Sequence, residues 1–180
     1  LSIPFDSLAT WSDMGIRFNQ HWGYRTVDGE KTVMNEKLNY YNKPQITLKD
    51  FWKINDKFSL SNITYLSVGR GGGTRLSNSA IQRDSTGLID WDLIIKENQV
   101  SSLFGTPNVD PLYDPELIKS SQVLLSSVNN HFWAGYLGQF NYEYSKKIQI
   151  SGGLDYRFYK GTHYQEIKDL LGGDYYIETS

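Results

Sequence analysis

The chain of 180 residues contains no cysteine, which excludes a disulfide framework and any thiol-based catalytic or metal site. It also lacks an excess of positive charge: 18 Lys and Arg against 20 Asp and Glu give a net charge of −2, which argues against nucleic-acid binding. No segment approaches the roughly 20 apolar residues of a membrane-spanning helix. A helical membrane protein is therefore excluded, whereas a membrane β-barrel is not, because its strands carry only one apolar face.

The first residues show no initiator Met, basic segment or apolar leader, so we expect no signal peptide within these residues. The last residues carry no stop signal for a helix or strand. We therefore expect residues 1–180 to be a segment of a longer protein.

Aromatic residues are abundant, with 13 Tyr, eight Phe and five Trp. Residues follow a period-two alternation from Phe132 to Ser145 and again from Ile148 to Tyr159, with Lys146-Lys147 between the two runs. Period-two alternation is typical of strands whose two faces meet different surroundings. Two such runs joined by a short polar turn predict a long β-hairpin.

A second hairpin is predicted from Lys43 to Val68, with its turn at Asn55-Asp56-Lys57. Its alternation is less regular, because Asp50, Phe51, Asn62 and Ile63 fall on the opposite face from the one their polarity predicts.

The remaining segments are predicted to be loops. About sixty residues, from Arg70 to Asn130, separate the hairpins, which is far beyond the usual loop length. We expect Gly71-Gly72-Gly73 to let a strand end open into this loop, Leu88–Asn98 to form a short helix, and Val123–Val128 to begin the third strand. Residues 1–37 are predicted to form another loop, and a last loop is expected to start near Thr162.

The predicted strands are about fourteen residues long, whereas globular strands average about 5–6 and membrane-spanning strands need about 9–11. If the apolar face meets lipid, the charged residues of the hairpin all point to the other side. A shift of one residue would turn them toward hydrocarbon, which costs up to about 2–4 kcal/mol for Arg. The residues predicted to face lipid are Phe132, Tyr136, Phe140, Ile150, Leu154 and Tyr156, and those predicted to face an aqueous lumen are Gln139, Asn141, Glu143, Asp155 and Arg157.

Several segments resemble TonB-dependent outer-membrane receptors of the Bacteroidetes type. They are Tyr40–Ile46, Phe51–Lys57, Gly69–Thr74, Asn129–Trp133, Ser151–Asp155, Tyr159–Tyr164 and Asp169–Tyr176. The resemblance covers most of the chain from about Phe18 onward.

This resemblance implies an all-β fold: an antiparallel meander of long hairpins, part of a large transmembrane β-barrel, with long outer loops that contain a short helix. Residues 1–180 would then be a partial barrel domain, without the plug domain and the remaining strands. Such receptors take up scarce nutrients, such as siderophores, cobalamin, glycans or peptides, across the outer membrane of Gram-negative cells and perform no bond chemistry. The implied partners are the rest of the barrel, the plug, the TonB complex, outer-membrane lipid and, in glycan uptake, a surface lipoprotein.

Two other interpretations stay open. A β-sandwich also alternates, so the chain could be a soluble carbohydrate-binding module that uses its exposed aromatic residues. A non-transporting surface barrel or adhesin is the third.

Catalytic and cofactor motifs are lacking. The glycine run is followed by Thr74-Arg75, which fits neither a P-loop nor a dinucleotide fingerprint, and no serine-hydrolase elbow is present. His21, His131 and His163 stand apart in the sequence, so no metal site and no cofactor are expected. Asp110, Asp114 and Glu116 are interleaved with Pro and predict turns. The residues predicted to contact a ligand from an outer loop are Arg70, Arg75, Trp91 and Tyr113.

Overall fold

The computed structural model describes residues 18–78, 80–101 and 105–178. The chain divides into two compact units, and each is described by itself. The strand unit comprises Asn39–Gly72 and Ser127–Tyr164, and the loop unit comprises Leu1–Leu38, Gly73–Ser126 and Gln165–Ser180. Most described residues belong to strands, mainly in antiparallel sheets, so the all-β class is confirmed.

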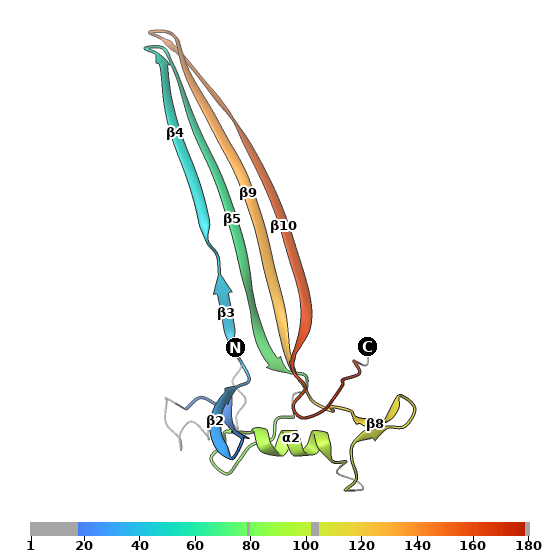
Figure 1. Ribbon diagram of the computed structural model, residues 1–180. Helices are drawn as coiled ribbons and strands as arrows, with labels where there is room; N and C mark the ends of the chain where they lie inside the picture. The colour runs from blue at the N-terminus through green and yellow to red at the C-terminus, as the bar shows by residue number, and fades with distance from the viewer. Residues whose placement is uncertain (1–17, 79, 102–104, 179–180) are drawn as a thin grey trace. The chain divides into compact units, whose positions relative to one another are not determined.

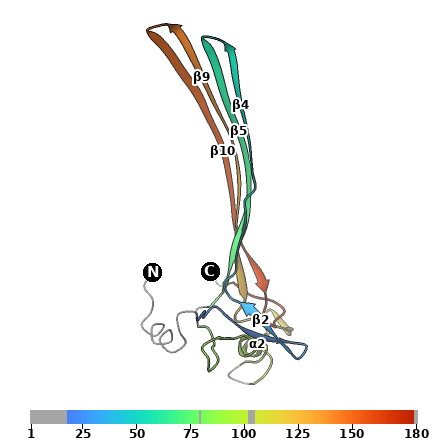
Figure 2. The same ribbon diagram turned by 90° about the vertical axis from the view of Figure 1, so that its left-hand side faces the viewer.

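The strand unit is a single sheet in the order β10-β9-β5-β3, with β4 also paired to β5. Its long strands lie side by side in one layer in both views (Figures 1 and 2). The strands are β3 (Asn39–Asn42), β4 (Gln45–Asn55), β5 (Phe58–Leu76), β9 (Leu124–Ser145) and β10 (Ile148–Asp169).

Both predicted hairpins are confirmed. The strands β9 and β10 are each 22 residues long and are separated by Lys146-Lys147 alone. In the β4–β5 pair, Asp50 lies opposite Asn62 and Lys49 lies opposite Ile63. Two of the residues that break the alternation, Asp50 and Asn62, are therefore paired with each other, and the register between the strands is continuous from Gln45 to Lys53.

Two predicted loop boundaries are wrong because strands continue through them. Gly71-Gly72-Gly73 do not open into a loop: β5 runs on to Leu76. The last loop does not start near Thr162, because β10 continues to Asp169. Glycine in the 71–73 run leaves room for a neighbouring ring, because an added Cβ at Gly71 would lie 2.1 Å from the Tyr41 ring.

The prediction of a loop over residues 1–37 is also wrong for its described part, and residues 1–17 lie outside the described residues. β1 (Trp22–Val27) and β2 (Glu30–Asn35) form an antiparallel hairpin in the loop unit. Its turn is Asp28-Gly29, with φ of 51° and 84°. An Asp-Gly pair readily adopts two consecutive positive φ values and is a strong signal for a hairpin turn. The prediction of one loop over residues 1–37 overlooked this signal.

The loop unit contains the predicted helix, α2 (Trp91–Gln99). Asp90 caps its N-terminus, because the side chain accepts a hydrogen bond from the backbone N–H of Leu93. β6 (Ile89–Asp90) pairs in parallel with β1, and β7 (Val109–Asp110) pairs with β8 (Asp114–Ile118). No helix in the described part of the chain has the length and hydropathy needed to cross a bilayer.

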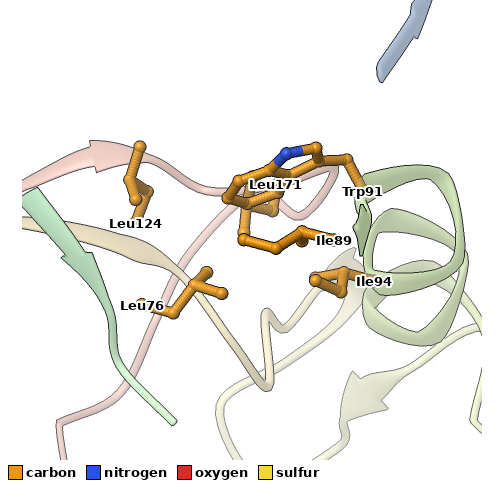
Figure 3. Packing of buried hydrophobic residues seen from close by; sticks show 6 residues of the cluster. All are labelled: Leu76, Ile89, Trp91, Ile94, Leu124 and Leu171. Atoms are coloured by element: carbon orange, nitrogen blue, oxygen red, sulfur yellow. The ribbon is translucent and has the colours of Figure 1, made fainter. Parts of the chain in front are cut away.

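The hydrophobic core of the loop unit gathers side chains from segments far apart in the sequence (Figure 3). Each fully buried aliphatic or aromatic side chain contributes about 1.5–3 kcal/mol to folding by leaving water. The six core residues are Leu76, Ile89, Trp91, Ile94, Leu124 and Leu171.

Asn98 joins three segments of the loop unit beside this core. Its Nδ2 donates to the carbonyls of Gln122 (2.7 Å) and Leu171 (2.9 Å). Its Oδ1 accepts from the backbone N–H groups of Ser121 (3.0 Å) and Gln122 (2.9 Å). The buried amide thus uses both its donors and both its acceptor positions, and it holds the turn after β10 and the segment before β9 against α2.

We predict that Asn98→Ala lowers the free energy of unfolding by about 3 kcal/mol or more, because it leaves several buried backbone groups without partners. Glu97→Ala, at an exposed position of the same helix, should change it by less than about 0.5 kcal/mol. Urea unfolding of the two variants measures the difference. Equal effects would contradict the role assigned to Asn98.

Candidate functional site

The strand unit has two chemically different faces, each recognised by contacts between its side chains. On the first, Phe58 contacts Phe140 (ring centroids 6.3 Å apart) and Phe132 contacts Phe158 (6.0 Å). On the second, Trp133 contacts Tyr159 (6.0 Å). These contacts join residues that the sequence alternation places on the same side. We call the first the apolar face, and it carries Phe132, Tyr136, Phe140, Ile150, Leu154 and Tyr156.

The large side chains of the apolar face are exposed. Leu154 is 62% exposed, Ile150 47% and Ile46 71%. Buried sheet faces of globular proteins pack against another layer, and the strand unit contains only one. Apolar area exposed on this scale marks a surface that contacts something else.

One polar cluster interrupts the apolar face. Tyr136 Oη donates to Asn62 Oδ1 at 2.7 Å, and Asn62 Nδ2 donates to Asp50 Oδ1 at 2.7 Å. The three side chains come from adjacent strands, and each of these polar groups has a partner within the sheet. This arrangement lowers the cost of keeping polar atoms on an apolar surface.

The opposite, polar face carries the residues that the sequence predicts to line a lumen: Gln139, Asn141, Glu143, Asp155 and Arg157. Asp155 and Arg157 form a two-pronged ion pair, with Nε–Oδ1 at 3.0 Å and Nη2–Oδ2 at 2.7 Å. Both are exposed, so this pair contributes little to stability. Its effect is to give the polar face fixed hydrogen-bonding groups.

A histidine cluster on the polar face was missed by the sequence reasoning. The rings of His131 and His163 have centroids 5.5 Å apart. His131 Nδ1 lies 2.6 Å from Tyr159 Oη, and His163 Nδ1 lies 2.7 Å from Asn129 Oδ1. Alternation alone puts these residues on one side, but their proximity depends on the register between β9 and β10, which the sequence pattern does not give.

Aromatic rings lie over glycines in the strand unit. An added Cβ would fall 2.2 Å from the ring of Tyr65 at Gly135, and 2.9 Å from the ring of Phe140 at Gly152. A ring resting on a neighbouring glycine fills the gap that the missing side chain leaves in the sheet. This packing explains why glycine occupies interior strand positions, where it is normally unfavourable.

The loop unit contains an open pocket of about 730 Å³, which Arg75 lines together with Lys37 and Arg83. Among the described residues, no carboxylate forms an ion pair with these three cations. The one carboxylate in the lining, that of buried Glu36, lies 2.9 Å from His21 Nδ1. The pocket therefore carries an excess of positive charge and lies within the size range of small-ligand sites.

The four residues predicted to contact a ligand are not brought together. Trp91 is fully buried in the core and donates its indole N–H to the carbonyl of Met34, so a stacking role for it is wrong. Arg70 is exposed in β5 rather than in a loop. Tyr113 is exposed and stacks on Tyr175 with ring centroids 4.6 Å apart. Only Arg75 lies in a pocket of the loop unit.

The ring stack of Tyr113 lies beside an acidic turn. Burial raises the pKa of Tyr175, and the nearby Asp110 carboxylate adds to this shift. A hydrogen bond from Lys119 lowers the pKa of Asp110. The turn predicted at Asp110 is confirmed, since its side chain accepts from the backbone N–H of Leu112, whereas the turn predicted at Asp114 is wrong because β8 begins there. Within residues 18–78, 80–101 and 105–178, no group of three or more His, Asp or Glu side chains is placed to hold a metal ion.

Comparisons with known proteins give no relative: no protein-family model, curated protein or solved structure matches the chain.

We predict that Gly135→Val costs about 1–3 kcal/mol of stability, because the new side chain must displace Tyr65. In a Tyr65→Ala background the same substitution should cost much less. A double-mutant cycle by urea unfolding measures the coupling. Additive effects of the two changes would show that the ring does not occupy this space.

Proposed function

We propose that the chain is part of the wall of a TonB-dependent outer-membrane receptor, which takes up a scarce nutrient across the outer membrane of a Gram-negative cell. In this proposal the apolar face contacts lipid and the polar face lines the lumen. The rest of the barrel, a plug and the TonB complex are the partners, with a surface lipoprotein as an additional one for glycan ligands. The exposed apolar face of a single-layered sheet is the observation that carries the proposal.

The extent of the apolar face fits a bilayer. On β10 it runs from Ile148 to Phe158 and is followed on the same side by Lys160, and on β5 it runs from Phe58 to Val68 and is followed by Arg70. Ten residue steps cover roughly 34 Å along a strand. At a tilt of about 45°, this corresponds to roughly 25 Å, the height of the apolar band of outer-membrane barrels.

Aromatic residues lie toward both ends of this band. Trp52 and Tyr144 are near the short turns, and Tyr156 and Phe158 are near the other end. Aromatic rings, above all those of Trp and Tyr, are favoured where hydrocarbon meets head groups. Two such levels support the assignment of the apolar face to lipid.

The proposal places ligand contact in the loop unit, at the pocket lined by Lys37, Arg75 and Arg83. Three cations without an acidic partner favour ligands that carry carboxylate or phosphate groups. The carbohydrate-binding sandwich receives less support, because Ile150 and Leu154 are exposed rather than packed against a second sheet.

Contact with lipid can be tested by single cysteines, since the sequence contains no native one. In the protein as expressed from its own gene and reconstituted in vesicles, Ile150→Cys and Ser151→Cys would each carry the same fluorophore. These neighbours lie on opposite faces of β10. We predict that brominated lipid quenches the label at position 150 strongly and the label at position 151 weakly.

Equal quenching at both positions, or protection of position 150 from lipid and water alike, would contradict the lipid-facing assignment. The second result would support a sheet packed against another protein layer.

Charge placed on the two faces should have different costs. We predict that Leu154→Arg lowers the free energy of unfolding in bilayers by up to about 2–4 kcal/mol, because the guanidinium would face hydrocarbon. Ser151→Arg, on the polar face of the same strand, should cost less than about 1 kcal/mol. Urea titration of vesicle-inserted protein measures both, and an equal cost would count against the proposal.

A further inference from the structure

We propose that His131 and His163 form a binding site for a divalent transition-metal ion of the zinc and copper group on the polar face, with Tyr159 and Asn129 orienting the two rings. No sequence motif indicates this site, because the two histidines are far apart along the chain. The inference rests on the geometry of the strand unit and not on whether its other face contacts lipid.

The separation of the two rings suits a shared ion. With metal–nitrogen bonds of about 2.0–2.1 Å and a tetrahedral angle, the centroids of two ligating imidazoles lie roughly 5 Å apart. The observed centroid separation of 5.5 Å is close to this value. Adjacent strands of a sheet hold the two side chains, so little movement is needed to bring them onto one ion.

Each imidazole is oriented by a second polar group. An amide oxygen can only accept, so the 2.7 Å contact to Asn129 Oδ1 places the proton of His163 on Nδ1 and leaves a lone pair on Nε2. Tyr159 Oη, 2.6 Å from His131 Nδ1, can accept in the same way. Such outer hydrogen bonds are typical of histidines that bind metals, because they fix the tautomer and the ring position.

The side chains of His163 and Tyr159 lie over Gly161. A Cβ at this position would lie 2.8 Å from His163 Nε2 and 3.0 Å from Tyr159 Oη. A side chain here would therefore displace the nitrogen that is free to bind the ion. Imidazole is the ligand type that zinc, nickel and copper share, and water from the exposed face can complete the coordination.

The test uses Cu²⁺ and Zn²⁺ alone as probes, with the purified full chain. By isothermal titration calorimetry, we expect one ion per chain, with affinity at least tenfold weaker in His131→Gln and in His163→Gln. Gly161→Ala should weaken binding by filling the space beside His163 Nε2. His21→Gln, which removes a histidine of the loop unit, is the matched control and should leave the affinity unchanged.

Electron paramagnetic resonance of the Cu²⁺ complex separates ligation from indirect effects on folding. We expect hyperfine coupling to two imidazole nitrogens in the unmodified protein and to one in each single variant. Absence of binding, coupling to fewer than two imidazoles in the unmodified protein, or equal loss in the His21 control would overturn the proposal.

Discussion

The strand unit depends on the alternation of its long strands, which places most apolar side chains on one face and most polar ones on the other. A sheet of this kind is stable only if its apolar face leaves water, and the single layer of the strand unit does not provide the cover. Lipid would cover this face without a second protein layer. The strands of a membrane barrel present one apolar face to lipid in the same way. The glycine positions covered by aromatic rings keep the sheet filled where side chains are missing.

The loop unit is organised differently, around a small core and one buried amide. The core of Trp91, Ile94 and their neighbours supplies apolar burial, while Asn98 fixes the backbone segments that the core alone would leave poorly defined. Leu76 belongs to this core and lines the pocket beside Arg75, so the core fixes part of the pocket wall.

Local patterns predicted much of this structure. Alternation gave the hairpin at Lys146-Lys147, and helical spacing gave α2 with Trp91 and Asn98 on its buried side. The errors have physical causes. Glycine at positions 71–73 was interpreted as a break, although Tyr40 and Tyr41 pack over this segment. Asp28-Gly29 carried a hairpin signal within a segment that otherwise lacks alternation.

The functional groups were harder to predict because they depend on register. His131 and His163 are separated by a hairpin, so only the pairing of β9 with β10 shows that their rings meet.

The orientation of whole strands in a bilayer is the most direct test of the proposed membrane wall. Polarised infrared spectroscopy of the reconstituted protein in aligned bilayers should give strands tilted by about 35–45° from the membrane normal. Unoriented strands, or protein that washes off the bilayer, would contradict it.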